Sequence, residues 1–436
     1  MCCMLRANGI YNTIFFMKGE CMMKSYNKLC LSGLLIFSGM LIAMEKPQGP
    51  MNAEWFYAQD NPFKVANDLH QERKWCEAEG EYNKKLKEGV GSQYDQDMAR
   101  LNLAACQMAQ RKPSEHWSSF DAVIGIPQEQ RLSDDVLIDT KNEKSVLVRT
   151  DQVGIGDIVH FMETTHQLKT MHPKWNVTVS VRPFLKNTLS DVIKGYGCEL
   201  ISEKDEQPKT DYITHIMGLF GHLKMDPAAT KPDKIVLTAP ERAVNVVNEQ
   251  INSILAQKNK MVLVGFAGEK RPATLIGGRQ LPHNNADYGR DIHPNAFQLL
   301  LKKHPNVVLM DCGTPISRVP VDEKCNDQYK VIVKEEQAFD TIVALAGIMS
   351  TNKKILALAA DQGPSNVFAR ALNKEGQKRM AFIIPNPGEY DMRMEGEGSQ
   401  YTQMISDCLV LKSKSTEVQN QLAVLEKALE MMTTDK

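Results

Sequence analysis

The chain has 436 residues, which is enough for two to three domains of ordinary size. With 42% hydrophobic and 24% charged residues, it has the composition of a globular protein and not of a disordered one. Its formal net charge of −1 at pH 7 creates no overall field that would attract a polyanion. We therefore expect no nucleic-acid partner.

An apolar segment near the N-terminus predicts export. Residues 29–44, LCLSGLLIFSGMLIAM, carry no charge and follow Lys24 and Lys28. This segment is shorter than the ~20 residues that span a bilayer, but it suits the core of a signal peptide. We expect a leader over residues 1–44 and an exported protein, periplasmic or secreted. An uncleaved membrane anchor through residues 29–44 is the alternative.

The cysteines form no metal-binding motif. Six of them follow the leader, and none stands in a C-x-x-C spacing, which argues against a zinc site. After export, both disulfides and buried free thiols are compatible with this pattern. The six are Cys76, Cys106, Cys198, Cys312, Cys325 and Cys408.

Residues 54–126 are predicted to form a small all-α unit. Apolar residues recur at helical spacing on both sides of a break at 89–91. They are Leu69, Trp75, Ala78, Tyr82 and Leu86 before the break, and Met98, Leu101, Ala105 and Met108 after it. Such a helical pair resembles a tetratricopeptide repeat, although Trp75, Ala78 and Tyr82 cover only part of that consensus. We expect the unit to pack on the following domain and to offer a surface for a partner protein.

From residue 144 the pattern changes to alternating strands and helices. Short apolar runs occur at 146–148, 177–181, 235–237, 261–266, 307–310, 331–333, 355–360 and 381–384. Most are separated by helix-length segments, which is typical of parallel sheets with crossover helices. We expect an α/β fold with two Rossmann-like lobes, over residues 144–240 and 241–412, and a ligand cleft between them. A C-terminal helix over residues 413–433 is expected to pack back on this core.

The first of these strands leads into a glycine loop. In KSVLVRTDQVGIGDIVHF, at 144–161, the strand is followed by Gly154 and Gly156 and then by an apolar helix. Backbone N–H groups at such a helix start bind anions readily. Asp157 stands where the loop becomes the helix, where a carboxylate can act as a general base. The alternative is that Asp157 only caps the helix.

Four segments in order resemble one enzyme family. Residues 146–181 resemble the first strand–loop–helix unit of the lipopolysaccharide heptosyltransferases and of related bacterial glycosyltransferase domains that follow tetratricopeptide repeats. Three later segments are similar to further motifs of these proteins. They are VLVGFAGEK at 262–270 with Arg290, DQGPSNVFARAL at 361–372, and IIPNPGEYDMR at 383–393. The resemblance implies a GT-B glycosyltransferase that moves a sugar from a nucleotide-sugar donor to a protein or glycan acceptor.

The resemblance also implies roles for individual residues. Asp157 would deprotonate the acceptor for an inverting attack, and Arg290 would bind the donor diphosphate. Because no strand-terminal D-x-D is found, we expect no metal and no other cofactor. The remaining donor-binding candidates are Gly154, Gly156, Asp361, Gln362, Gly363, Pro364, Ser365 and Asn366.

The phosphate loop departs from the family pattern at two positions. Gln362 replaces a Ser or Thr, and Asn366 replaces a His, so that the loop cannot carry a positive charge at residue 366. Two hypotheses follow. The chain is an inverting, metal-independent glycosyltransferase, or it is an inactive relative that works as a tetratricopeptide-type interaction module.

Overall fold

The structure is a computed structural model. It describes residues 3–7, 10–14, 58–72, 74–110, 112, 114–139, 142–151, 153–225, 237–267, 292–312, 319–320, 322–331, 338–360, 363–384, 408–415 and 417–434. The chain divides into two compact units, Met1–Pro47 and Gln48–Lys436. In the first unit, strands β1 (Cys3–Ala7) and β2 (Ile10–Ile14) form an antiparallel pair. The apolar segment 29–44 lies outside the described residues. Among the helices that are described, none has the length and apolar character needed to cross a membrane.

The second unit begins with three helices, where the periodicity predicts helices. They are α3 (Lys64–Gln71), α4 (Trp75–Lys87) and α5 (Gln93–Ala109). Their shared core includes Phe63, Tyr82 and Met98, and the Tyr82 hydroxyl donates to Asn67 Oδ1 at 2.7 Å. The chain turns between α4 and α5 through Gly89 and Gly91, which have φ values of 64° and 80°. Glycine adopts these conformations without the strain that a side chain would add.

Four short helices connect this unit to the first sheet. They are η1 (Glu115–Ser118), α6 (Ser119–Val123), η2 (Gln128–Gln130) and α7 (Asp134–Ile138). Trp117 and Phe120, from η1 and α6, are buried and belong to the same hydrophobic cluster as the first sheet. This connection is therefore part of the α/β core.

The first sheet is parallel, with strand order β5-β4-β3-β6. Its strands are β3 (Ser145–Arg149), β4 (Asn176–Val181), β5 (Glu199–Ser202) and β6 (Tyr212–His215). The helices of this first lobe are α8 (Ile155–Phe161), α9 (Glu163–Met171), η3 (Pro183–Leu185), α10 (Lys186–Gly195) and α11 (Ile216–His222). The central strands β3 and β4 are buried almost throughout, as expected when helices cover both faces of a sheet. Of the run predicted as a strand at 235–237, only Leu237 is described, and it is not in a strand.

The second sheet is also parallel, with strand order β12-β11-β10-β7-β8-β9. Its strands are β7 (Met261–Gly265), β8 (Val307–Asp311), β9 (Tyr329–Val331), β10 (Ile355–Ala359), β11 (Met380–Ile384) and β12 (Leu409–Lys412). The helices of this second lobe are α12 (Glu241–Leu255), α13 (Pro294–Lys303), η6 (Glu323–Gln328), α14 (Ala338–Thr351), α15 (Gly363–Ala371), α16 (Lys374–Gln377) and α18 (Val418–Thr434).

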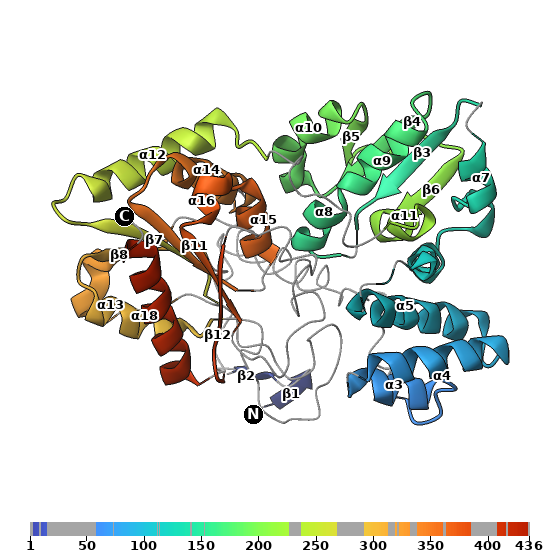
Figure 1. Ribbon diagram of the computed structural model, residues 1–436, viewed down its shortest axis with the longest axis horizontal. Coiled ribbons are helices and arrows are strands. Elements are labelled where there is room, and N and C mark those ends of the chain that lie inside the picture. The colour runs from blue at the N-terminus through green and yellow to red at the C-terminus, as the bar shows by residue number, and fades with distance from the viewer. Residues whose placement is uncertain are drawn as a thin grey trace, which may run out of the picture. The chain divides into compact units, whose positions relative to one another are not determined.

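Alternate residues of these strands face two separate hydrophobic clusters, as the period of a strand requires. Val262 and Val264 of β7 share a cluster with α12, α14 and α15. Leu263 between them belongs to a second cluster with α13 and α18 (Figure 1). In α18, Leu422, Leu425 and Leu429 are buried in this second cluster. The expectation of an α/β chain with two parallel sheets is thus confirmed.

Candidate functional site

The glycine loop after β3 places Asp157 in the first turn of α8. Gly154 is the N-cap residue, so Asp157 occupies the third helical position and not the cap itself. A Cβ built on Gly154 would lie 3.1 Å from Asp157 Oδ2, which shows that the carboxylate folds back over the start of the helix. Negative charge is favourable there. Gly156 is buried, Gly154 is exposed, and Asp157 is half-buried.

This loop is held by residues at the carboxyl ends of three parallel strands, one through the Asp151 side chain and two through backbone carbonyls. Arg149, at the end of β3, donates to both carboxylate oxygens of Asp151, at 2.9 and 2.5 Å. Arg182, directly after β4, donates from Nη2 to the carbonyl of Val153 at 2.5 Å. Nε2 of His215, the last residue of β6, lies 2.7 Å from the carbonyl of Asp151. This edge of a parallel sheet is where ligands bind in open α/β folds.

The protonation state of His215 follows from its two hydrogen bonds. Nδ1 accepts from the backbone N–H of Met217 at 3.1 Å, so Nε2 carries the proton and donates to the Asp151 carbonyl. Burial lowers the pKa of His215, against the opposing effects of its bond to Asp151 and of the nearby carboxylates. The imidazole is therefore neutral near pH 7. The sequence reasoning missed His215, because β6 has the mixed sequence Tyr-Ile-Thr-His and no apolar run.

The second half of the predicted site lies at the start of α15, just beyond β10. Gly363 and Pro364 are the first residues of this helix. Ser365 is fully buried, and its hydroxyl has no hydrogen-bond partner among the residues that the structure describes. Asn366 lies in the same turn of α15. Arg290, Asp361 and Gln362 lie outside the described residues.

Helices α8 and α15 pack against each other, so the two predicted halves of the site are on neighbouring elements (Figure 1). Ile158 and Val159 of α8 belong to one hydrophobic cluster with Val367 and Phe368 of α15. The two lobes also meet at α10 and α14, where the Thr188 hydroxyl donates to the carboxylate of Asp340. The structure therefore brings the helix that carries Asp157 next to the helix that begins at Gly363.

Titratable side chains that the sequence did not single out lie near this contact. The rings of His166 and Tyr196 are 4.7 Å apart, and both residues are in the first lobe. Burial chiefly raises the pKa of Tyr196, Glu163 raises it further, and the positive charge of Arg370 on α15 lowers it. The net shift is upward, so the phenol stays protonated at neutral pH. Arg370, in the second lobe, is therefore close enough to act electrostatically on Tyr196 in the first lobe.

The described residues include no metal-binding cluster, and the cysteines are mostly buried. Within the described ranges, no group of three or more His, Cys, Asp or Glu side chains is placed to hold a metal ion. Of the six cysteines beyond the leader, Cys76, Cys198 and Cys325 are free thiols, and Cys106, Cys198, Cys312 and Cys325 are buried. For Cys76, Cys198 and Cys325, the structure shows the free-thiol alternative.

Comparison with known proteins gave matches among solved structures alone. No family model matches the chain, and no curated protein matches it. The chain is similar to ADP-heptose lipopolysaccharide heptosyltransferase II of E. coli, with 10% identity and a TM-score of 0.41 over 67% of this chain and 100% of that one. It is also similar to a family 9 glycosyl transferase of Veillonella parvula, with 11% identity and a TM-score of 0.40 over 67% of this chain and 98% of that one. Both neighbours are of the class that the sequence motifs resemble.

Proposed function

We propose that the protein is a glycosyltransferase that transfers a sugar from a nucleotide-sugar donor to a protein or glycan acceptor. One observation carries this proposal above the others. Asp157 and the phosphate-loop segment stand just beyond the carboxyl ends of two different parallel sheets, and the helices that carry them pack together. Sugar transfer requires a base for the acceptor hydroxyl and an anion-binding helix N-terminus for the diphosphate, and both must lie in one region.

The α15 side of the site would hold the donor. When the glycosidic bond breaks, negative charge develops on the departing diphosphate, and fixed N–H donors stabilise it. The first turn of α15 supplies such donors from the backbone, and the Ser365 hydroxyl adds one that no described residue uses. Gly363 and Pro364 leave this turn without long side chains. We assign Arg290, Asp361, Gln362 and Asn366 to the same diphosphate on the sequence resemblance, and we propose that no metal takes part.

The α8 side would hold the acceptor. Asp157 would take the proton from the acceptor hydroxyl as it attacks the anomeric carbon, and the diphosphate would leave from the opposite face. A single displacement of this kind inverts the anomeric centre. The exposed Gly154 leaves the space beside the Asp157 carboxylate free of a Cβ atom, and we assign Gly154 and Gly156 to close approach of the donor. The loop bonds from Arg182 and His215 would keep the base in place.

Two expectations about the cellular context complete the proposal. We propose that residues 29–44 direct export, so the enzyme would act where nucleotide sugars are available to an exported protein, such as the cytoplasm of another cell. We also propose that α3–α5 provide the surface for a protein acceptor or partner. No feature of the described residues favours the alternative of an inactive interaction module.

Diphosphate binding is the test of this proposal. The purified protein is titrated with UDP, ADP and GDP by calorimetry, and we expect saturable binding of one of the three without added metal. The same protein is then incubated with a panel of nucleotide sugars while diphosphate release is followed. Absence of binding to all three nucleotides would contradict the proposal.

A further inference from the structure

We propose that His215 is a positioning residue that holds the glycine loop, and with it Asp157, in the geometry for proton transfer. The catalytic part of this inference rests on the proposed function, whereas the structural part does not. His215 touches no atom of the predicted reaction. It acts through the Asp151 carbonyl, which its Nε2 contacts at 2.7 Å.

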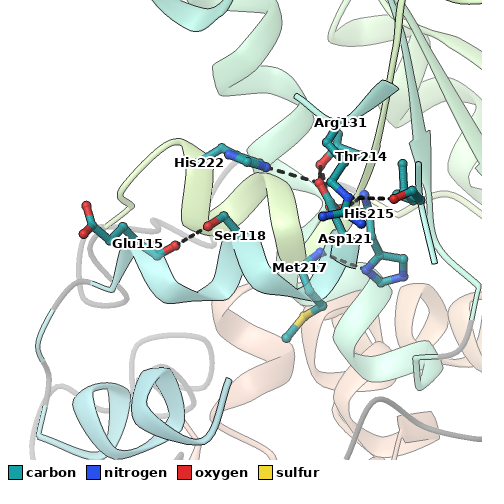
Figure 2. Close-up of polar contacts among 9 residues, drawn as sticks. Glu115, Ser118, Asp121, Arg131, Thr214, His215, Met217 and His222 are labelled. Atoms are coloured by element: carbon teal, nitrogen blue, oxygen red, sulfur yellow. Dashed lines mark hydrogen bonds and ion pairs between the residues drawn. The ribbon is translucent and has the colours of Figure 1, made fainter. Parts of the chain in front are cut away.

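The position of His215 is set by the buried carboxylate of Asp121, on α6. Asp121 Oδ1 accepts from the backbone N–H of His215 at 2.7 Å, and Oδ2 accepts from the Thr214 hydroxyl at 2.8 Å (Figure 2). His222 Nε2 lies 3.2 Å from the same Oδ2. Asp121 has no exposed surface, so its carboxyl oxygens are satisfied by these partners and not by water. The end of β6 and the start of α11 are thereby tied to the segment that follows the helical unit.

The orientation of the His215 ring is set independently of Asp121's carboxylate. Phe120, next to Asp121, stacks on the imidazole with ring centroids 4.3 Å apart and an interplanar angle of 18°. The Met217 N–H fixes the tautomer by donating to Nδ1. With position, ring plane and tautomer all determined, the Nε2–H group points at one carbonyl of the loop. The contacts from Phe120 and Asp121 bring together residues far apart in sequence, so they exist only in the folded lobe.

The loop carries this constraint to Asp157 over a short distance along the chain. Asp151 is held by His215 and Arg149, Val153 is held by Arg182, and α8 begins at the next residue but one. A displacement of about 1 Å at a catalytic group lowers a rate by about 100-fold. The loop is therefore held at two carbonyls, those of Asp151 and Val153, shortly before the turn that carries the proposed base.

The test uses His215→Asn in the full-length protein. Asparagine is among the preferred N-cap residues, so it can still accept from the Met217 N–H and cap α11. Its side chain is too short to reach the Asp151 carbonyl. His172→Asn is the matched control, because His172 is also buried in the first lobe and also stacks on an aromatic ring, that of Trp175 at 3.9 Å. Among the described residues, neither ring nitrogen of His172 has a hydrogen-bond partner.

The first measurement is hydrogen exchange of the peptide that covers residues 150–156. We expect exchange to be faster by roughly 2- to 10-fold in His215→Asn, the effect of losing one hydrogen bond, and unchanged in His172→Asn. Equal exchange in the two variants would overturn the proposal. If His215→Asn does not fold, Asp121→Asn is measured in its place. It is expected to accelerate exchange in the same peptide, and a wild-type exchange rate there would overturn the proposal equally.

The second measurement is steady-state transfer with the donor that the wild type uses. For His215→Asn we expect kcat to fall by about tenfold or more while the Kd for the nucleoside diphosphate changes less than twofold, because the loop positions the base and not the donor. An unchanged kcat, or a loss confined to Kd, would overturn the positioning role. If the wild type transfers no sugar, the proposed function fails, while the exchange measurement still decides whether His215 holds the loop.

Discussion

Helix α11 makes an unusually close contact with η1, and this contact gives the sharpest stability prediction. At Gly221, an added Cβ would lie 2.2 Å from the backbone nitrogen of Ser118 and 2.7 Å from the carbonyl carbon of Trp117. Ordinary van der Waals contact begins at 3.4 Å, so Gly221→Ala requires the two backbones to separate by about 1.2 Å. No side-chain rotation can relieve a contact between a Cβ atom and a backbone.

The cost follows from what that separation disturbs. Overpacking of a filled core costs about 1–3 kcal/mol, and here it displaces the buried ring of Trp117. The same movement stretches the 2.7 Å bond from the His215 N–H to Asp121 toward the limit of hydrogen bonding, and a hydrogen bond to a charged group contributes about 1.5–3 kcal/mol. Alanine has a higher helix propensity than glycine, which offsets up to ~1 kcal/mol of this loss. We expect a net loss of about 1.5–6 kcal/mol in the free energy of unfolding, depending on how far the bond is stretched.

Equilibrium unfolding in urea, followed by circular dichroism, measures this loss. Gly347→Ala is the control, because Gly347 lies inside α14 and an added Cβ there meets nothing within 4 Å. That variant should be more stable than the wild type by about 0.5–1 kcal/mol. If Gly221→Ala were as stable as the wild type, the close packing of α11 on η1 would be refuted.

Two further predictions concern acid stability and the phosphate loop. Burial lowers the pKa values of His116, His172 and His215 below 6.5, so below that pH the unfolded chain takes up protons before the folded one does. The stabilisation that these three neutral imidazoles give should therefore be fully present above pH 6.5. It should be lost as the pH drops below 6.5, by at most about 1.4 kcal/mol per pH unit for each group. Urea midpoints at pH 5.5 and 7.5 measure this loss, which should be smaller in His215→Asn. Ser365→Ala removes a buried hydroxyl without a partner among the described residues, so the melting temperature should not fall, whereas the Kd for the diphosphate should rise about tenfold. A lower melting temperature with unchanged binding would make Ser365 a structural residue.

The sequence predicts the interior strands of both sheets better than their edges. Strands β3, β4, β7, β8, β10 and β11 lie inside the sheets or are buried by helices on both faces, and each contains a run of apolar residues. Strands β5 and β6 are edge strands, partly exposed, with the mixed sequences ELIS and YITH. Neither strand contains a run of three apolar residues, so the patterns gave no signal for these two. Strand β12, also at an edge, was missed although LVL at 409–411 is an apolar run as long as the one at 146–148.

The same distinction applies to the candidate site. Asp157 and the residues 363–366 could be found because each follows a buried strand and a glycine in a local pattern. His215 stands at the end of an edge strand, and Asp121 reaches it across 94 positions in the chain. Contacts between residues so far apart in the chain depend on how the helices pack. A local spacing pattern in the sequence does not predict that packing. The Gly218 backbone illustrates this, since an added Cβ there would lie 2.2 Å from Asp121 Oδ1.

The role of Asp157 as the base is the central claim, and one comparison tests it most directly. Wild-type protein and Asp157→Asn are incubated with the nucleotide sugar that supports diphosphate release, and calorimetry gives the Kd of each for the diphosphate. Because a positioned base contributes about 10²- to 10⁴-fold to a rate, Asp157→Asn should lose that factor in kcat and keep its affinity for the diphosphate. Gly154 holds the N-cap position of α8, so the substitution leaves the cap intact. Full turnover in Asp157→Asn would contradict the account and leave Asp157 as a residue that only stabilises the start of its helix.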